Sequence, residues 1–113
     1  MDVILKAKIK VRDGRMTSLS GLKAQLWDAD PMVDDFLAAG IVEGSSYLDY
    51  TVEFRFDLEK ASSFDSPGEV NPDLYILVED ANGKHVFRST TVRDFDFARG
   101  EGGRVQSVTF VEA

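Results

Sequence analysis

The sequence predicts an all-β fold, a Greek-key β-sandwich of about seven short strands in one domain over residues 1–113. Hydrophobic residues recur with a period of two, most clearly over residues 3–11 and 50–56. Turn-forming residues separate these segments at the spacing that is typical of a sandwich. Parallel βαβ architecture is disfavoured, because no segment is long enough for a crossover helix.

The first two strands follow from this alternation. In residues 3–12, hydrophobic residues alternate with Lys6, Lys8, Lys10 and Arg12, and Arg12 begins a turn. We interpret this segment as an edge strand whose lysines face solvent and discourage edge-to-edge aggregation. Residues 19–27 form the second expected strand, with alternate hydrophobic residues on one face.

A short helix is expected next, over residues 32–39. Asp30 can cap it, Pro31 suits its first position and Gly40 suits its end. Residues 41–42 are expected to begin a short strand before a turn at 43–46.

The second half of the chain supplies the remaining strands. Residues 50–56 alternate with an aromatic inner face, and residues 74–78 are continuously hydrophobic, as expected of a central strand. Asn82-Gly83 predicts a hairpin with a type I′ turn. Strands over residues 85–92 and 104–111 complete the count. The predicted core is Leu5, Ala7, Ile9, Leu26, Tyr50, Val52, Phe54, Phe56, Leu74, Ile76, Val78 and Val108.

The segment after the second strand is the most acidic of the chain. Asp28, Asp30, Asp34 and Asp35 lie within eight residues, and Asp94 and Asp96 form a second pair that can approach from across the sandwich. Clustered carboxylates on a loop suit calcium, which takes six to eight oxygen ligands. The same residues also cap helices, initiate turns or face water. Both interpretations stay open, and calcium is the one cofactor that the sequence leaves open.

Two aromatic residues are candidates for a binding loop. Trp27 adjoins the acidic segment, where it can stack on a sugar, insert into a membrane, or pack at the rim with its N–H satisfied locally. Phe64 lies in a long loop over residues 61–72, either as an exposed anchor or folded back onto the core.

Composition excludes several function classes. The net charge of −7 disfavours nucleic acid, which needs a basic patch. The absence of cysteine excludes thiol catalysis and thiolate zinc sites. His85 is the only histidine, and no G-x-S-x-G elbow occurs. We therefore expect no enzymatic activity. No segment is apolar enough to span a bilayer and no leader is recognisable, so we expect either a cytoplasmic protein or a domain of a secreted protein without its signal.

Several segments, taken in order, resemble bacterial transthyretin-like domains, also described as carboxypeptidase-regulatory-like modules. They read L-W-D-A-D-P and D-D-F-L within 26–37, Y-T-V-E-F-R-F at 50–56, N-P-D-L-Y at 71–75 and V-E-D-A-N-G-K at 78–84. The resemblance implies a seven- or eight-stranded Greek-key sandwich that serves as an accessory or interaction domain. Residues 42–50 depart from the Thr-Asp-x-x-Gly-x-Phe turn that such modules usually carry. The C-terminus lacks the Tyr-Arg-Gly-Ser motif of the hydroxyisourate hydrolases that share this fold.

Residues 26–37 also resemble the third calcium loop of the calcium-dependent membrane-binding domains of synaptotagmins and protein kinase C. That resemblance implies Asp28, Asp30 and Asp35 as calcium ligands, with Asp34 adjacent.

Taken together, these observations predict a non-catalytic module for protein interaction, with a protein as partner and a homo-oligomer left open. The alternative is a calcium-dependent lipid- or carbohydrate-binding domain that uses the acidic loop 28–35.

Overall fold

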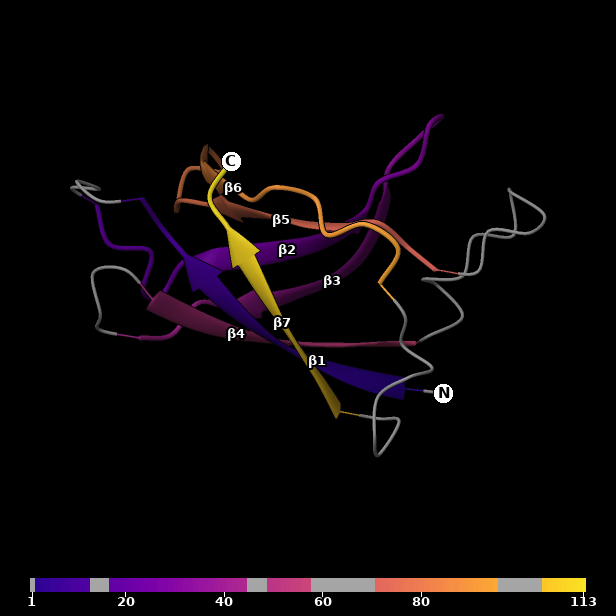
Figure 1. Cartoon of the computed structure of the whole chain (residues 1–113). Coiled ribbons are helices and arrows are strands. Elements are labelled where there is room, and N and C mark those ends of the chain that lie inside the picture. Colours follow the sequence, from indigo (N-terminus) through magenta and orange to yellow (C-terminus); the bar gives the residue numbers. More distant parts are fainter. Residues whose placement is uncertain (1, 13–16, 45–48, 58–70, 96–104) are drawn as a thin grey trace.

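The computed structural model describes residues 2–12, 17–44, 49–57, 71–95 and 105–113. These residues form seven strands in two facing sheets (Figure 1), which confirms the predicted β-sandwich. The strands are β1 (Asp2–Lys10), β2 (Lys23–Asp28), β3 (Asp35–Ile41), β4 (Asp49–Asp57), β5 (Leu74–Glu79), β6 (His85–Arg88) and β7 (Val105–Val111). The described part of the chain contains no helix long and apolar enough to cross a membrane.

One sheet has the strand order β4-β1-β7 and the other the order β3-β2-β5-β6. All neighbouring strands run antiparallel except β1 and β7, which are parallel. Only the β2–β3 and β5–β6 connections stay within a sheet, so the chain crosses between the sheets four times. Crossings of this kind make a Greek-key sandwich.

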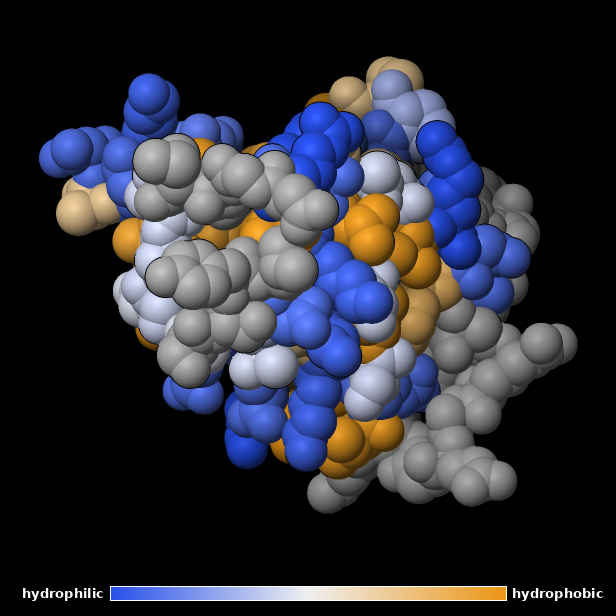
Figure 2. Space-filling model, turned by 60° about the vertical axis from the view of Figure 1, so that its left-hand side comes forward, coloured by the Kyte–Doolittle hydropathy of each residue, from blue (hydrophilic) through white to orange (hydrophobic). Residues whose placement is uncertain are grey.

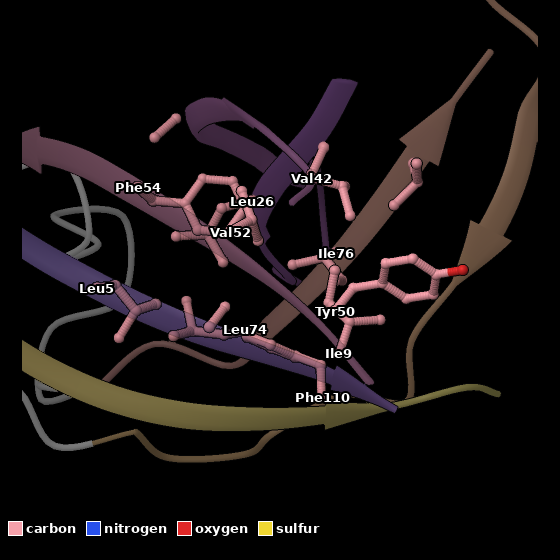
Figure 3. Packing of buried hydrophobic residues seen from close by; sticks show 14 of the residues in the cluster. Leu5, Ile9, Leu26, Val42, Tyr50, Val52, Phe54, Leu74, Ile76 and Phe110 are labelled. Carbon is pink, nitrogen blue, oxygen red and sulfur yellow. The ribbon is translucent and has the colours of Figure 1, made fainter. Parts of the chain in front are cut away.

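The core lies between the two sheets, where inward side chains of opposite strands meet (Figure 3). In β1 and β4 burial alternates with every residue, as the sequence period predicts. The register places Leu5 opposite Phe54 and Ile9 opposite Tyr50. All the predicted core residues are buried except Val108, which is only partly buried because β7 lies at the edge of its sheet.

The prediction that the lysine-rich first strand is an edge strand is wrong. β1 lies in the centre of its sheet, between β4 and β7. Lys6, Lys8 and Lys10 do face solvent, so the alternation is right while the position in the sheet is not. A local sequence pattern shows which face of a strand is buried. It does not show whether the strand is central, because that depends on its partners, and the partner β7 comes from the far end of the chain.

The helix predicted over residues 32–39 is also wrong, because the structure has β3 there. Ala38 and Ala39 pair with Leu26 and Gln25 of β2, with a register shift between Leu26 and Trp27. An isolated helix of two turns is marginal, whereas a strand paired with β2 satisfies its backbone and buries Leu37. Asp30 and Pro31 start a hairpin turn instead.

The two sheets meet at both sides of the sandwich. On one side Gly40 of β3 approaches β4 so closely that an added Cβ atom would lie 2.6 Å from the Glu53 carbonyl oxygen. On the other side the Thr90 N–H donates to the Val111 carbonyl at 2.9 Å, and the Ala113 N–H donates to the Arg88 carbonyl at 2.9 Å.

The predicted β5–β6 hairpin forms, but not through a type I′ turn. Of the turn residues only Gly83 has a positive φ, of 80°. The Asp80 carboxylate accepts the backbone N–H groups of Asn82 and Lys84 at 2.9 and 3.0 Å. These bonds stabilise a turn that has one positive φ, whereas a type I′ turn requires two.

Candidate functional site

The turn between β2 and β3, residues 29–34, projects beyond the body of the sandwich (Figure 1). We call it the hairpin tip. Two apolar side chains lie there in solvent, Met32 with 89% and Val33 with 72% of its surface exposed. Phe36, directly after the tip, is 47% exposed. Half of the six large exposed hydrophobic residues in the described chain therefore gather at one end of one hairpin.

Carboxylates within the tip fix its backbone. The Asp30 Oδ1 atom accepts the Met32 N–H at 3.0 Å, and the Asp30 N–H donates to the Asp34 Oδ1 atom at 3.1 Å. Pro31 lies between these bonds with its φ fixed by the ring. The bond from Met32 to Asp30 is of the Asx type, and with the bond from Asp30 to Asp34 it stabilises the turn locally.

Asp34 also ties the tip to the sheet. Its Oδ2 atom accepts the Tyr75 hydroxyl at 2.5 Å, and the Arg88 guanidinium lies 4.3 Å from the centre of the Tyr75 ring. The hydrogen bond from Tyr75 lowers the pKa of Asp34. Burial, with the bond to Asp34, raises the pKa of Tyr75 to about 12. This pair therefore stays a carboxylate bonded to a neutral phenol across the ordinary pH range.

At the base of the hairpin, Asp28 is 4% exposed and accepts the Asp73 N–H at 3.2 Å. The Ala29 N–H donates to the Asp73 carbonyl at 2.7 Å. Asp73 in turn accepts the Asp94 N–H at 2.8 Å, and Asp94 has a positive φ of 56°. Asp28 and Asp94 thus both contact Asp73: the Asp73 N–H donates to the Asp28 carboxylate, and the Asp73 carboxylate accepts the Asp94 N–H.

Trp27 lies on the outer face of β2, opposite Phe36 on β3 and Tyr75 on β5. Its ring meets that of Phe36 edge to face, with centroids 5.5 Å apart. The indole N–H donates to the Gln25 amide oxygen at 3.2 Å. The local partner for the N–H is the one expected of a packed rim tryptophan, and the aromatic contact continues the apolar surface of the tip onto the sheet.

The described residues contain no group of three or more histidine, aspartate and glutamate side chains placed to hold a metal ion. Asp28 and Asp34 take protein hydrogen bonds, and Asp35 pairs with Asp28 across the β2–β3 ladder. Asp96 and Phe64 lie outside the described residues. The calcium assignment therefore stays a prediction.

Several residues of this site escaped the sequence analysis. Met32, Val33 and Phe36 lay in the expected helix, and Asp73 and Tyr75 were not expected to be site residues. Phe36 and Tyr75 lie on either side of Trp27 because β3 and β5 both pair with β2, and no local signal indicates this, since burial along β3 does not alternate residue by residue. Nothing in the local pattern reveals the bond between Asp28 and Asp73, since the two residues are 45 positions apart.

A second surface lies on the outer face of the β4-β1-β7 sheet. An open hollow of about 790 Å³ is lined there by Lys6, Lys8, Thr51, Ser107 and Thr109 among others. On the face drawn in Figure 2, hydrophobic residues are interspersed with hydrophilic ones.

No family model matches the sequence, and no curated protein matches it significantly. Among solved structures the chain is similar to the crystal structure of a 9R-lipoxygenase from Cyanothece PCC8801, with 19% sequence identity and a TM-score of 0.46. The likeness covers 94% of this chain and 16% of that one, so the chain spans about a sixth of the lipoxygenase. A likeness of this degree assigns neither a family nor a function, and the transthyretin-like assignment stays a prediction. The chain is a β-sandwich that matches one part of a lipoxygenase chain.

Proposed function

We propose that this chain is a non-catalytic module that binds a partner protein through the hairpin tip and the adjoining face of Trp27 and Phe36. The observation that carries the proposal is the pair Met32 and Val33, exposed at the end of a projecting turn whose backbone is fixed by Asp30 and Asp34. A turn that is ordered before binding loses little conformational entropy when a partner covers it.

The energetics favour a small apolar anchor surrounded by polar groups. Burying a Met or Val side chain in a partner's pocket contributes about 1.5–3 kcal/mol each. Phe36 adds an aromatic surface of the type found at the centre of interfaces. Asp30 and Asp35 border the apolar residues, and the chain carries a net charge of −7. These charges favour a partner whose pocket has a basic rim.

The absence of catalytic activity remains part of the proposal. His85, the only histidine of the chain, is exposed on β6. The carboxylates around the tip accept hydrogen bonds from the backbone and from Tyr75. Because these carboxylates already accept hydrogen bonds within the protein, we assign them a structural role. The exposed apolar residues of the tip are then the ones left to bind a partner.

A second candidate function is calcium-dependent binding to a lipid surface or a carbohydrate. The observation that favours it is the position of Met32 and Val33 between Asp30 and Asp35, where calcium could link carboxylates to anionic headgroups while the apolar pair enters the bilayer. For a carbohydrate, Trp27 would supply the stacking surface. Without calcium, the acidic residues would be repelled by an anionic membrane.

Capture on the immobilised chain tests the first function. We expect a partner that the native chain retains, that Met32→Ser/Val33→Ser loses, and that Ile41→Ser retains. Ile41 is a matched control, because it is 57% exposed and lies at the opposite end of β3. Equal retention by all three proteins would contradict the proposal.

Vesicles and calcium test the second function. Thermal unfolding in EDTA and then in excess calcium, together with sedimentation with phosphatidylserine vesicles, would separate the two candidates. A calcium-dependent rise of the midpoint that Asp30→Asn abolishes, with calcium-dependent sedimentation, would replace the protein partner by a lipid surface. No response to calcium would leave the protein partner as the function.

A further inference from the structure

We propose that the open edge of β7 pairs antiparallel with β7 of a second copy of this chain. The surface is separate from the hairpin tip and does not depend on the function proposed above. It consists of the main-chain N–H and C=O groups of Val105, Ser107 and Thr109.

Two hydrogen bonds show which way the backbone of β7 points. The Glu112 N–H donates to the Lys10 carbonyl of β1, whereas the Val111 carbonyl points the other way and accepts from Thr90. Because successive residues of a strand direct their backbone groups to opposite sides, Val105, Ser107 and Thr109 point away from β1. Within the described chain these three residues have no strand partner on that side.

The edge of β7 lacks the charges that protect a sheet edge. Its seven residues, Val105–Val111, include no Lys, Arg, Asp, Glu or Pro. The opposite edge of the same sheet, on β4, is different: Thr51 is bonded to Glu43, and the following residues on that side are Glu53, Arg55 and Asp57. Charged edges discourage strand addition, and neutral ones permit it. Of the two edges, β7 is therefore the one suited to a partner strand.

Packing points the same way. The β7 sheet has three strands and faces a sheet of four. Val108 points inward but is only partly buried, and Val105 is 45% exposed. A strand added beside β7 would cover both residues and extend the smaller sheet.

A second copy fits this edge in one register. If Ser107 lies opposite Ser107 of the other chain, Val105 lies opposite Thr109 and all three outward residues form bonded pairs, which gives about six hydrogen bonds. The register stops before Val111, whose carbonyl is already bonded to Thr90. No like charges meet within the strands, since β7 has none. The lysine rows on β1 of the two copies would be three strand spacings apart, about 14 Å, which is beyond the screening length at physiological salt.

Disulfide trapping tests the register directly, because the chain has no cysteine of its own. In Ser107→Cys the two thiols of the dimer would be directly opposite, with Cα atoms about 5.5 Å apart, within the range that a disulfide spans. In Thr109→Cys they would be four residues apart along the strands, about 13 Å, and could not join. We expect oxidation to cross-link the first variant and leave the second and Thr51→Cys monomeric.

Sedimentation equilibrium over about 10 µM to 1 mM gives the second readout. The native chain and Met32→Ser/Val33→Ser should dimerise equally, while Ser107→Lys, which places like charges opposite each other, should be monomeric. Thr51→Lys on the same face should still dimerise. A native chain that stays monomeric throughout, or equal cross-linking of all three cysteine variants, would overturn the proposal. Neither result would affect the function assigned to the tip.

Discussion

The base and the tip of the β2–β3 hairpin differ in what their side chains do. At the base Asp28 is buried and bonded to Asp73, and within the tip Asp34 is bonded to Tyr75. Met32 and Val33, in the same turn and at most five residues from Asp28, lie in solvent. The contrast teaches that the acidic residues stabilise a turn, and that the turn presents apolar side chains that do nothing for stability. Removing the hydrogen bonds of Asp28 or Asp34 should therefore destabilise the protein, and truncating Met32 and Val33 should not.

The largest effect is expected from Asp28→Ala. The change removes a nearly buried acceptor and leaves the Asp73 N–H without it, so the free energy of unfolding should fall by about 2 kcal/mol. Urea denaturation measures the change, with Asp2→Ala as the control, because Asp2 is an exposed residue at the start of β1. Equal losses in the two variants would show that the base of the hairpin is not a structural anchor.

For Gly40→Ala, near the end of β3 that lies away from the tip, we expect the free energy of unfolding to fall by about 1–3 kcal/mol. The added Cβ atom would meet the Glu53 carbonyl oxygen at 2.6 Å and the Val52 Cγ2 atom at 2.8 Å, so β3 and β4 would have to separate. The midpoint of thermal unfolding reports the loss. An unchanged midpoint would mean that the two sheets can move apart there without cost.

A smaller effect, of about 1 kcal/mol at neutral pH, is expected from Tyr75→Phe, which removes the hydrogen bond to Asp34. The pKa of Asp34 is lowered by folding, so its contribution is present above pH 3.8 and disappears as the pH falls through the lower folded value. The pKa of Tyr75 is raised to about 12, so its contribution is complete below pH 10 and disappears as the pH rises towards 12.

The pH profile of unfolding distinguishes this account from simple packing. The difference in stability between the native chain and Tyr75→Phe should be greatest between about pH 5 and pH 9 and should shrink at both extremes. A difference that stays constant over the whole range would assign the loss to packing of the phenol ring instead of to the bond.

The smallest effect is expected from Met32→Ser/Val33→Ser. Both side chains are mostly exposed, so the free energy of unfolding should change by less than about 0.5 kcal/mol per substitution. Urea denaturation measures this change in the free energy of unfolding, so it can be compared directly with that of Asp28→Ala. A loss as large as that of Asp28→Ala would mean that the tip packs against the fold and is not free to bind a partner.

The same contrast explains which features could be predicted from the sequence. Alternation in β1 and β4 shows directly which side chains are buried, because a strand's two faces differ in environment. The helix expected over residues 32–39 failed because capping signals at Asp30 and Pro31 also suit a hairpin turn, and pairing with β2 decides between them. The central position of β1 depends on pairing with β7, a contact between the two ends of the chain.

The acidic segment of the site, too, could be predicted only in part from the sequence. The sequence predicted that its carboxylates need partners, because like charges after a strand repel one another. The partners themselves are distant in sequence: the Asp73 backbone for Asp28 and the Tyr75 hydroxyl for Asp34. The apolar tip was missed because Met32 and Val33 lay in the expected helix, whereas the structure places them in the turn before β3.

The affinity of the captured partner tests the central claim most directly. Isothermal titration should give a dissociation constant about a hundredfold weaker for Met32→Ser/Val33→Ser than for the native chain, which corresponds to about 3 kcal/mol of lost apolar burial. The control variant Ile41→Ser also removes an exposed hydrophobic side chain, but outside the tip. Its dissociation constant should be within about twofold of that of the native chain. Equal affinities for the native chain and the tip variant would contradict the account.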